Sequence, residues 1–218
     1  MKENLVEFIF KARYCTLGDF SSSTKQIWFV LHGYGQLARF FIRKFETLTS
    51  RSIGLVAPEG LSRFYLEEMS KRSATGNNRV GATWMTAENR LMDIENYLHY
   101  LSAVHSQVMK NHPEIPVTIL GFSQGSATAS RWVIQHPDCC SRLILWAGIF
   151  PPDMEFDKAG QILTSKKLLM VYGRNDPYVT DQRLEEMTSI NRRLRVSPEV
   201  LAFEGGHEID DQTLQRLV

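Results

Sequence analysis

A short apolar segment that runs directly into a glycine-flanked serine is the feature that most constrains this chain. Val117–Gly121 (VTILG) has the length and apolar composition of a buried strand, and it continues into the pentapeptide GFSQG around Ser123. The next residues, Ser126–Ala129, are small and belong to a helix predicted over Gln124–His136, which Pro137 ends. Glycines on either side of a serine, between strand and helix, are typical of the nucleophile elbow, a strained turn that exposes the hydroxyl. The context therefore predicts Ser123 as a nucleophile.

Similar apolar segments recur along the chain and predict further strands. Each is short and bounded by turn residues, which is typical of strands buried on both faces of a mainly parallel sheet. The amino-terminal segment alternates polar and apolar residues instead, so an opening strand at a sheet edge is expected there. The predicted strands are Glu7–Thr16, Gln26–Leu31, Ile53–Ala57, Val117–Gly121, Arg142–Ala147, Lys167–Tyr172 and Glu199–Phe203.

Helix-like segments separate most of these strands. Besides the helix after Ser123, we expect helices over Thr86–Asn111, Asp181–Leu194 and Asp211–Val218. In the first of these, helical spacing predicts a buried face made of Leu91, Ile94, Leu98, Leu101 and Val108. This alternation of strands and helices predicts a three-layer α/β architecture with helices on both faces of the sheet.

No repeat or linker interrupts the pattern, so we expect a single domain over residues 1–218 without a large cap domain. The least regular stretch, residues 59–83, follows a predicted strand. It should therefore lie at the carboxyl edge of the sheet, where ligands bind in open α/β folds.

The composition argues against several classes of function. With 22% charged residues and a net charge of +1, the chain has no strong field that would favour nucleic acid. Its three cysteines lack the spacing of a disulfide framework or a zinc site. No HExxH, GxGxxG or Walker motif occurs, so neither a metal nor a cofactor is expected. The sequence has no signal-peptide pattern and no transmembrane-length run, which indicates a cytoplasmic protein without stable membrane insertion, either monomeric or homodimeric.

A serine hydroxyl needs a base, and the expected chain order with this elbow is serine, then aspartate or glutamate, then histidine. Asp176 follows the predicted strand Lys167–Tyr172 in the loop GRNDP, and His207 follows Glu199–Phe203 after paired glycines. We therefore expect His207 to act as general base and later general acid. Asp176 is the carboxylate expected to fix the tautomer of the imidazole.

Other histidines and carboxylates fit these roles less well. Four histidines lie inside predicted helices or at helix ends, at His99, His105, His112 and His136. Asp210 is close to His207 in the sequence, but it has the position of a helix cap. Because a carboxylate on a separate strand is the usual geometry, Asp210 is the second choice after Asp176.

The loop after the strand Gln26–Leu31 has the sequence HGYG. Its glycines let the backbone approach a reacting carbonyl, so this loop is expected to contribute one oxyanion donor, for which only the backbone of Tyr34 is needed. The second donor is expected to be the N–H of Gln124, the residue after the nucleophile. His32 is expected to shape the loop rather than to react.

These motifs together resemble the phospholipase/carboxylesterase family, a branch of the α/β-hydrolases that includes acyl-protein thioesterases. The resemblance rests on LHGYG, GFSQG, GRNDP and the final Gly-His pair, which occur in this order over nearly the whole chain. It implies an α/β-hydrolase fold with Ser123, Asp176 and His207 as the triad. It also implies Tyr34 and Gln124 as the oxyanion-hole residues.

Two departures from the family pattern concern substrate recognition. Members usually carry an acidic residue after the second glycine of the first loop, where this chain has Gln36. Residues 59–86 match only loosely the family's tryptophan-containing loop. Both departures lie where acyl and leaving groups would be recognised, so the reaction class is better predicted than the substrate.

The leading hypothesis is an esterase or thioesterase that acts on a small-molecule substrate through an acyl-enzyme on Ser123. The alternatives are a non-catalytic protein of the same fold that binds a ligand, and a peptidase or perhydrolase that uses the same three residues. Three residues of the loop-rich rim are expected to contact the substrate, namely Phe64, Trp84 and Met85.

Overall fold

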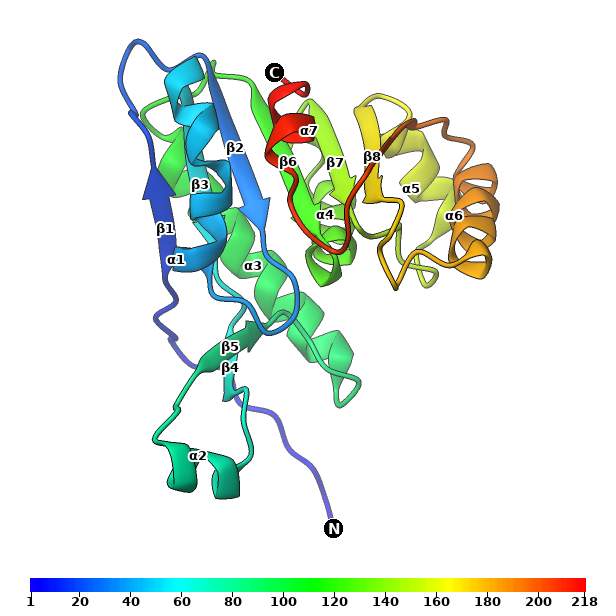
Figure 1. Cartoon of the computed structure of the whole chain (residues 1–218). Helices are drawn as coiled ribbons and strands as arrows, with labels where there is room; N and C mark the ends of the chain where they lie inside the picture. The colour runs from blue at the N-terminus through cyan, green and yellow to red at the C-terminus, as the bar shows by residue number, and fades with distance from the viewer.

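A computed structural model describes residues 1–218 and contains a central sheet of seven strands in the order β1-β3-β2-β6-β7-β8-β9 (Figure 1). β1 is antiparallel to β3, whereas every other neighbouring pair in this sheet is parallel. The mainly parallel sheet is thus as predicted. Its strands are β1 (Tyr14–Leu17), β2 (Gln26–Leu31), β3 (Ile53–Pro58), β6 (Val117–Phe122), β7 (Arg142–Trp146), β8 (Lys167–Gly173) and β9 (Glu199–Phe203).

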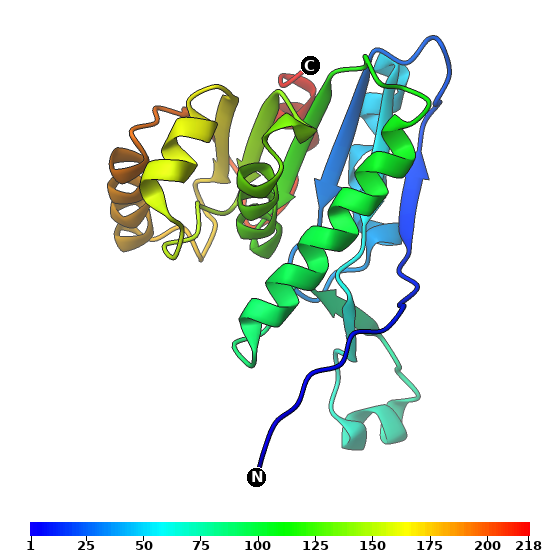
Figure 2. The ribbon, with the colours of Figure 1, turned by 180° about the vertical axis from the view of Figure 1, so that it is seen from behind.

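Helices cover both faces of the sheet, as Figures 1 and 2 show from opposite sides. One face carries α1 (Ala38–Phe41), the 3-10 helix η1 (Ile42–Arg51) and α7 (Asp211–Gln215). The other face carries α3 (Arg90–Met109), α4 (Gln124–Gln135), α5 (Phe156–Leu163) and α6 (Asp181–Leu194), with the short 3-10 helix η2 (Pro137–Cys139) after α4. This arrangement confirms the predicted three-layer architecture.

Alternate residues of each central strand pack into opposite layers. In β2, Phe29 points into the core under α3 and α4, where its ring lies 5.4 Å from that of Trp132. Its neighbours Trp28 and Val30 point into the core under α1, η1 and α7. Successive side chains of a strand point to opposite faces of its sheet, so a strand buried on both sides must be apolar throughout.

The opening strand is shorter than predicted. We expected Glu7–Thr16, but β1 begins at Tyr14, and the residues before it form no strand. Tyr14 pairs with Pro58, the last residue of β3, so no strand lies opposite the preceding residues. An alternating pattern alone cannot form a strand where the neighbouring strand has ended.

The prediction for the long helix was wrong at its amino-terminal end. The helix α3 begins at Arg90 rather than Thr86, and Leu91 in its first turn is 70% exposed. In Figure 2 this end of α3 extends beyond the sheet, so it has no core to contact. The residues that α3 buries fully are Tyr97, Leu101 and Val104.

The irregular stretch after β3 contains a small projecting subsheet. The strands β4 (Ser62–Tyr65) and β5 (Val80–Thr83) are antiparallel and enclose the short helix α2 (Met69–Thr75). This unit projects from the carboxyl edge of the sheet without forming a large cap (Figure 1). No helix of the structure has the length and hydropathy needed to cross a membrane.

We predict that Phe29→Ala lowers the free energy of unfolding by about 3–5 kcal/mol, because it empties a fully buried site between β2 and α4. Urea unfolding followed by circular dichroism measures this change. Leu91→Ala is the control, and its exposed position predicts a change within about 0.5 kcal/mol. A large loss for Leu91→Ala would mean that the first turn of α3 is buried after all.

Candidate active site

The candidate residues come together at the carboxyl edge of the sheet. Ser123 follows β6, Asp176 lies in the loop after β8, and His207 lies in the loop after β9. Because these strands are parallel, their carboxyl ends meet at one edge. The direction of strand addition also reverses between β2 and β6, since the chain first adds β3 on one side and later continues on the other. Such a reversal is where open α/β sheets form ligand crevices.

Ser123 has the strained backbone of a nucleophile elbow. Its φ is 53° and its ψ is −117°, a conformation that residues other than glycine rarely adopt. The turn is held by a 2.8 Å hydrogen bond from the Ser123 N–H to the carbonyl of Trp146. A side chain at Gly125 would collide with the carbonyl oxygen of Leu31, so glycine is required for α4 to approach β2. The hydroxyl of Ser123 is thereby presented at the edge of the sheet.

The side chains of His207 and Asp176 form a close pair. The Nδ1 of His207 lies 2.7 Å from Oδ2 of Asp176, whose side chain is fully buried. The other oxygen, Oδ1, accepts a 2.9 Å hydrogen bond from the backbone N–H of Tyr178. The imidazole ring itself lies between Phe122 and Tyr178, with ring centroids at 4.9 and 4.8 Å. These contacts hold the ring with Nδ1 towards the carboxylate, so that Nε2 is the nitrogen left for chemistry.

Backbone hydrogen bonds join the two loops that carry this pair. Arg174 N–H donates to the carbonyl of Phe203 at 2.8 Å, and Asn175 N–H donates to that of Gly205 at 2.9 Å. On the far side of His207, the indole N–H of Trp146 donates to the carbonyl of Glu208 at 2.8 Å. The segment that carries the imidazole is therefore held by the loop after β8 and by Trp146 at the end of β7.

Two backbone N–H groups near Ser123 have no acceptor within the chain. One belongs to Tyr34 in the loop after β2, and the other to Gln124, the first residue of α4. The first N–H groups of a helix lack intrahelical partners and carry partial positive charge, which favours a nearby anion. The side chain of Tyr34 is 61% exposed and packs on Phe64 with a centroid distance of 5.0 Å. Both predicted oxyanion donors are thus free to bind an oxygen.

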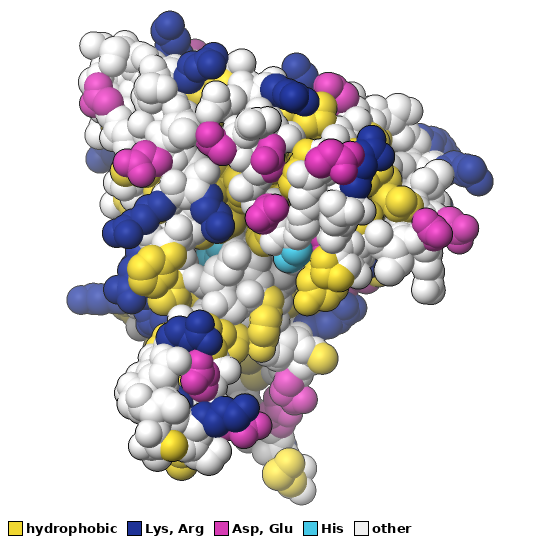
Figure 3. Space-filling view, viewed as in Figure 1, with side chains coloured by type: hydrophobic (Ala, Val, Ile, Leu, Met, Phe, Trp, Pro, Cys, Tyr) yellow, Lys and Arg dark blue, Asp and Glu magenta, His cyan; other side chains and the backbone are white.

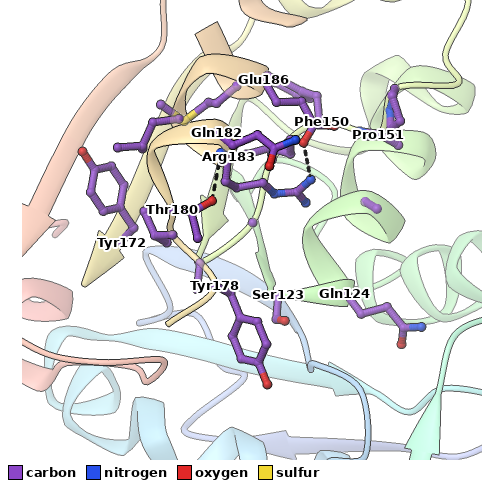
Figure 4. A pocket seen from close by; sticks show the side chains of 18 of the residues that line it. Ser123, Gln124, Phe150, Pro151, Tyr172, Tyr178, Thr180, Gln182, Arg183 and Glu186 are labelled. Atoms are coloured by element: carbon purple, nitrogen blue, oxygen red, sulfur yellow. Dashed lines mark hydrogen bonds and ion pairs between the residues drawn. The ribbon is translucent and has the colours of Figure 1, made fainter. Parts of the chain in front are cut away.

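The side chain of Gln124 has a separate role. It points away from Ser123 in Figure 4, and its amide donates 2.9 Å hydrogen bonds to Thr83 Oγ1 and to the carbonyl of Met85. Its carbonyl accepts from the backbone N–H of Trp84 at 3.2 Å. The residue after the serine therefore binds the segment that leaves β5.

His32 is a buried neutral histidine that supports the first loop. Its Nδ1–H donates to the carbonyl of Gly33 at 2.7 Å, and its Nε2 accepts from Gly60 N–H at 2.9 Å. Burial lowers the pKa of His32 to about 4, and the acceptor role of Nε2 requires the neutral ring. Trp84 stacks on this ring and donates its indole N–H to the carbonyl of His32 at 2.8 Å.

Ser123 and His207 line one cavity with a volume of about 610 Å³. It lies between α4 and α6; Figure 4 shows Ser123 and Tyr178 towards one end, with Gln182, Arg183 and Glu186 of α6 further away. Figure 3 shows hydrophobic side chains around the histidines visible on this face. The apolar lining residues are Met85, Ala127, Ala147, Ile149, Phe150, Pro151, Pro152, Val179, Leu184 and Met187.

The three predicted substrate contacts have different positions. Met85 lines the cavity. Trp84 is only 1% exposed and belongs to the hydrophobic core, so its prediction as a substrate contact must be corrected. Its indole instead stacks on the ring of His32. Phe64 lies outside the cavity lining and packs on Tyr34.

Sequence reasoning missed several residues of the cavity wall. Tyr178 contacts His207, and Arg131 and Asp153 form a 2.7 Å ion pair. Arg131 could have been found, since it lies on α4 two turns after Gln124 and therefore on a similar face of the helix. Asp153 has no comparable signal, because its loop after β7 contains no motif.

The competing residues lie elsewhere. His105 and His136 line a separate hollow beside Cys139. Asp210 caps α7, where its carboxylate accepts a 2.7 Å hydrogen bond from Thr213 N–H. The structure contains no cluster of histidine, cysteine and acidic side chains arranged to hold a metal ion.

Comparison with known proteins gives one matching family and several similar solved structures. A family model described as serine hydrolase (FSH1) matches residues 22–216, whereas no curated protein sequence matches the chain. Acyl-protein thioesterase 2 from Zea mays has a similar structure, with a TM-score of 0.68 and 17% identity over 95% of this chain and 96% of that chain. A carboxylesterase from Mesorhizobium loti gives a TM-score of 0.66 and 18% identity, over 89% and 87% of the two chains. A phospholipase/carboxylesterase from Dyadobacter fermentans gives 0.63 and 17%, over 97% and 96%. These likenesses confirm the α/β-hydrolase fold.

The buried neutral ring of His32 predicts a pH-dependent stability. The pKa of His32 is about 4 in the folded protein and 6.5 in an ordinary environment, so between these values only the unfolded chain binds the proton. This contribution is present above pH 6.5 and is lost as the pH falls towards 4, by about 3 kcal/mol.

Urea unfolding at pH 7 and pH 4 of the unmodified protein and of His32→Gln measures this contribution as the difference between the two proteins. An equal pH dependence in both would contradict a neutral buried ring.

Proposed function

The chain belongs to the serine hydrolase (FSH1) family, and we propose that it cleaves carboxylic esters or thioesters through an acyl-enzyme on Ser123. The observation that carries this proposal is the strained turn, which presents the Ser123 hydroxyl to the same cavity as His207 while Asp176 binds the far side of the imidazole. A serine, a base and a carboxylate that orients the base are the minimal set for acyl transfer by serine.

In the proposed reaction, His207 Nε2 takes the hydroxyl proton as the Ser123 oxygen attacks the carbonyl carbon of the substrate. Asp176 holds the Nδ1–H tautomer and stabilises the imidazolium that forms. The tetrahedral intermediate collapses, the imidazolium gives its proton to the leaving alcohol or thiol, and an acyl-enzyme remains. A water molecule then attacks the acyl-enzyme with His207 as base, which releases the acid and restores the serine.

The free N–H groups of Tyr34 and Gln124 are the proposed oxyanion hole. Negative charge develops on the carbonyl oxygen during attack, and fixed N–H dipoles stabilise it without reorganisation. The position of Gln124 at the start of α4 supports this role, because the helix contributes partial positive charge there. The strained φ of Ser123 supports it too, since the turn brings the hydroxyl beside that helix end.

The cavity favours a small acyl substrate rather than a polypeptide. Its volume of about 610 Å³ is that of a small-molecule site, and much of its lining is apolar. The thioesterase, carboxylesterase and phospholipase/carboxylesterase among the similar structures support ester or thioester cleavage as the reaction to test first.

A fluorophosphonate probe should label the folded protein at Ser123, and Ser123→Ala should abolish the labelling. We expect Ser123→Ala to lower kcat on p-nitrophenyl butanoate by several orders of magnitude, on the order of 10⁶ where such triads have been dissected. Mass spectrometry identifies the labelled residue. Folded protein that remains unlabelled would refute the hydrolase mechanism and favour a protein that only binds its ligand.

Asp176→Asn should lower kcat by roughly 10⁴ with folding intact, because the amide favours the wrong tautomer of His207. Asp210→Asn is the matched control: it changes the capping carboxylate of α7 near His207 in the sequence, and kcat should remain within about twofold. Steady-state assays on one p-nitrophenyl ester compare the two. The opposite ranking would make Asp210 the orienting carboxylate.

A further inference from the structure

One wall of the cavity contains an ion-pair network in which two arginines share one carboxylate. Arg131 of α4 lies 2.7 Å from one oxygen of Asp153, and Arg90 at the start of α3 lies 2.9 Å from the other. Although burial opposes it, the hydrogen bond and charge of Arg131 keep the pKa of Asp153 below its usual range. The carboxylate is therefore ionised, and a single negative charge faces two positive ones.

The rest of the cavity does not neutralise this excess. The opposite wall contributes Arg183 and Glu186 of α6, which form their own 2.6 Å ion pair. The lining thus contains three arginines but only two carboxylates. The unmatched positive charge lies at the wall formed by α3 and α4.

Arg131 also has donor capacity that its ion pair with Asp153 does not use. Its side chain is only 12% exposed, and one terminal nitrogen pairs with Asp153. The other, Nη1, contacts the thioether sulfur of Met85 at 3.9 Å, which is a weak acceptor, and the buried hydroxyl of Tyr97 also lies beside the guanidinium. A guanidinium that is largely removed from water and incompletely paired is a favourable place for an anionic oxygen, because charge-assisted hydrogen bonds are stronger there than in bulk water.

We infer that this wall binds an anionic group of the substrate, so that the preferred ester or thioester carries a carboxylate at the end remote from the scissile bond. The inference rests on the proposed function and specifies its substrate class. Arg131 follows Gln124 by seven residues of α4, which separates their backbones by about 10 Å along the helix. A straight acyl chain of medium length has the reach to span that distance.

If the network only held the loop of Asp153 in place, a single arginine would be enough. One arginine would suffice to neutralise Asp153 and hold its loop against α4. The second arginine, Arg90, is 43% exposed. It adds a positive charge to the wall although Arg131 already compensates the carboxylate of Asp153. If the wall binds an anion, both arginines contribute and the protein prefers anionic substrates. If the network is only structural, the charge of the substrate does not affect the preference.

The test compares kcat/KM for esters matched in length but not in charge. Mono-p-nitrophenyl suberate carries a terminal carboxylate, and its methyl ester is the neutral counterpart. A second pair, 4-carboxyphenyl butanoate and its methyl ester, places the carboxylate on the leaving group instead. We expect at least about tenfold preference for the anionic member of one pair, the size of a hydrogen bond to a charged group. The pair that responds identifies which half of the substrate contacts the arginines.

Variants assign that preference to the network. Arg131→Gln and Arg90→Gln should each reduce the ratio of anionic to neutral kcat/KM several-fold, and raised salt should reduce it in the unmodified protein. Arg79→Gln is the control, because it removes an exposed arginine that pairs with Glu67 outside the cavity, and the ratio should persist. If Arg131→Gln fails to fold, the exposed Arg90→Gln still decides the question.

A flat ratio in both pairs, or a ratio that both arginine variants leave unchanged, overturns the inference while Ser123 labelling leaves the hydrolase proposal intact. A binding measurement tests anion recognition independently of ester hydrolysis. Monomethyl suberate should bind the Ser123→Ala protein, which cannot turn it over, more tightly than dimethyl suberate by calorimetry, and adding Arg90→Gln should remove the difference. Equal binding of both compounds would refute anion recognition whether or not the protein hydrolyses esters.

Discussion

The close approach of α4 to β2 and β6 is the constraint on which the candidate site depends. It requires glycine at position 125 and accompanies a strained backbone with positive φ at Ser123. The strain is tolerated because a backbone hydrogen bond to Trp146 and the packing of α4 on both strands determine the turn from several sides. Ser123 is therefore positioned by the sheet and the helix together, rather than by contacts of its own side chain.

The remaining groups are positioned by the parallel sheet. Loops that leave β8 and β9 are joined by backbone hydrogen bonds, so Asp176 and His207 meet although they are far apart in the sequence. The loop that leaves β2 brings Tyr34 to the same edge, supported by the buried neutral ring of His32. Each candidate residue thus lies on the loop after a different strand, and hydrogen bonds between neighbouring loops hold these residues in position.

The parts of the fold that could be predicted are those in which local pattern and tertiary packing agree. β9 and α6 have the predicted bounds, because turn residues and apolar spacing mark both ends. The opening strand was predicted too long, since its length depends on where β3 ends. Trp84 was predicted at the surface of the site but is buried, because aromatic residues near a site can equally support it. The pairing of Arg131 with Asp153 depends on the approach of two distant segments, which no local pattern records.

Gln124 connects two properties that are usually considered separately. Its backbone N–H has no acceptor within the chain and is a proposed oxyanion donor, while its side chain binds the segment containing Met85, which lines the cavity beside Ser123. A change that reshapes this wall is transmitted by two hydrogen bonds to the first turn of α4. If the proposed reaction holds, selectivity and turnover are coupled through this residue, and a change of substrate along this wall also changes the rate of the chemical step.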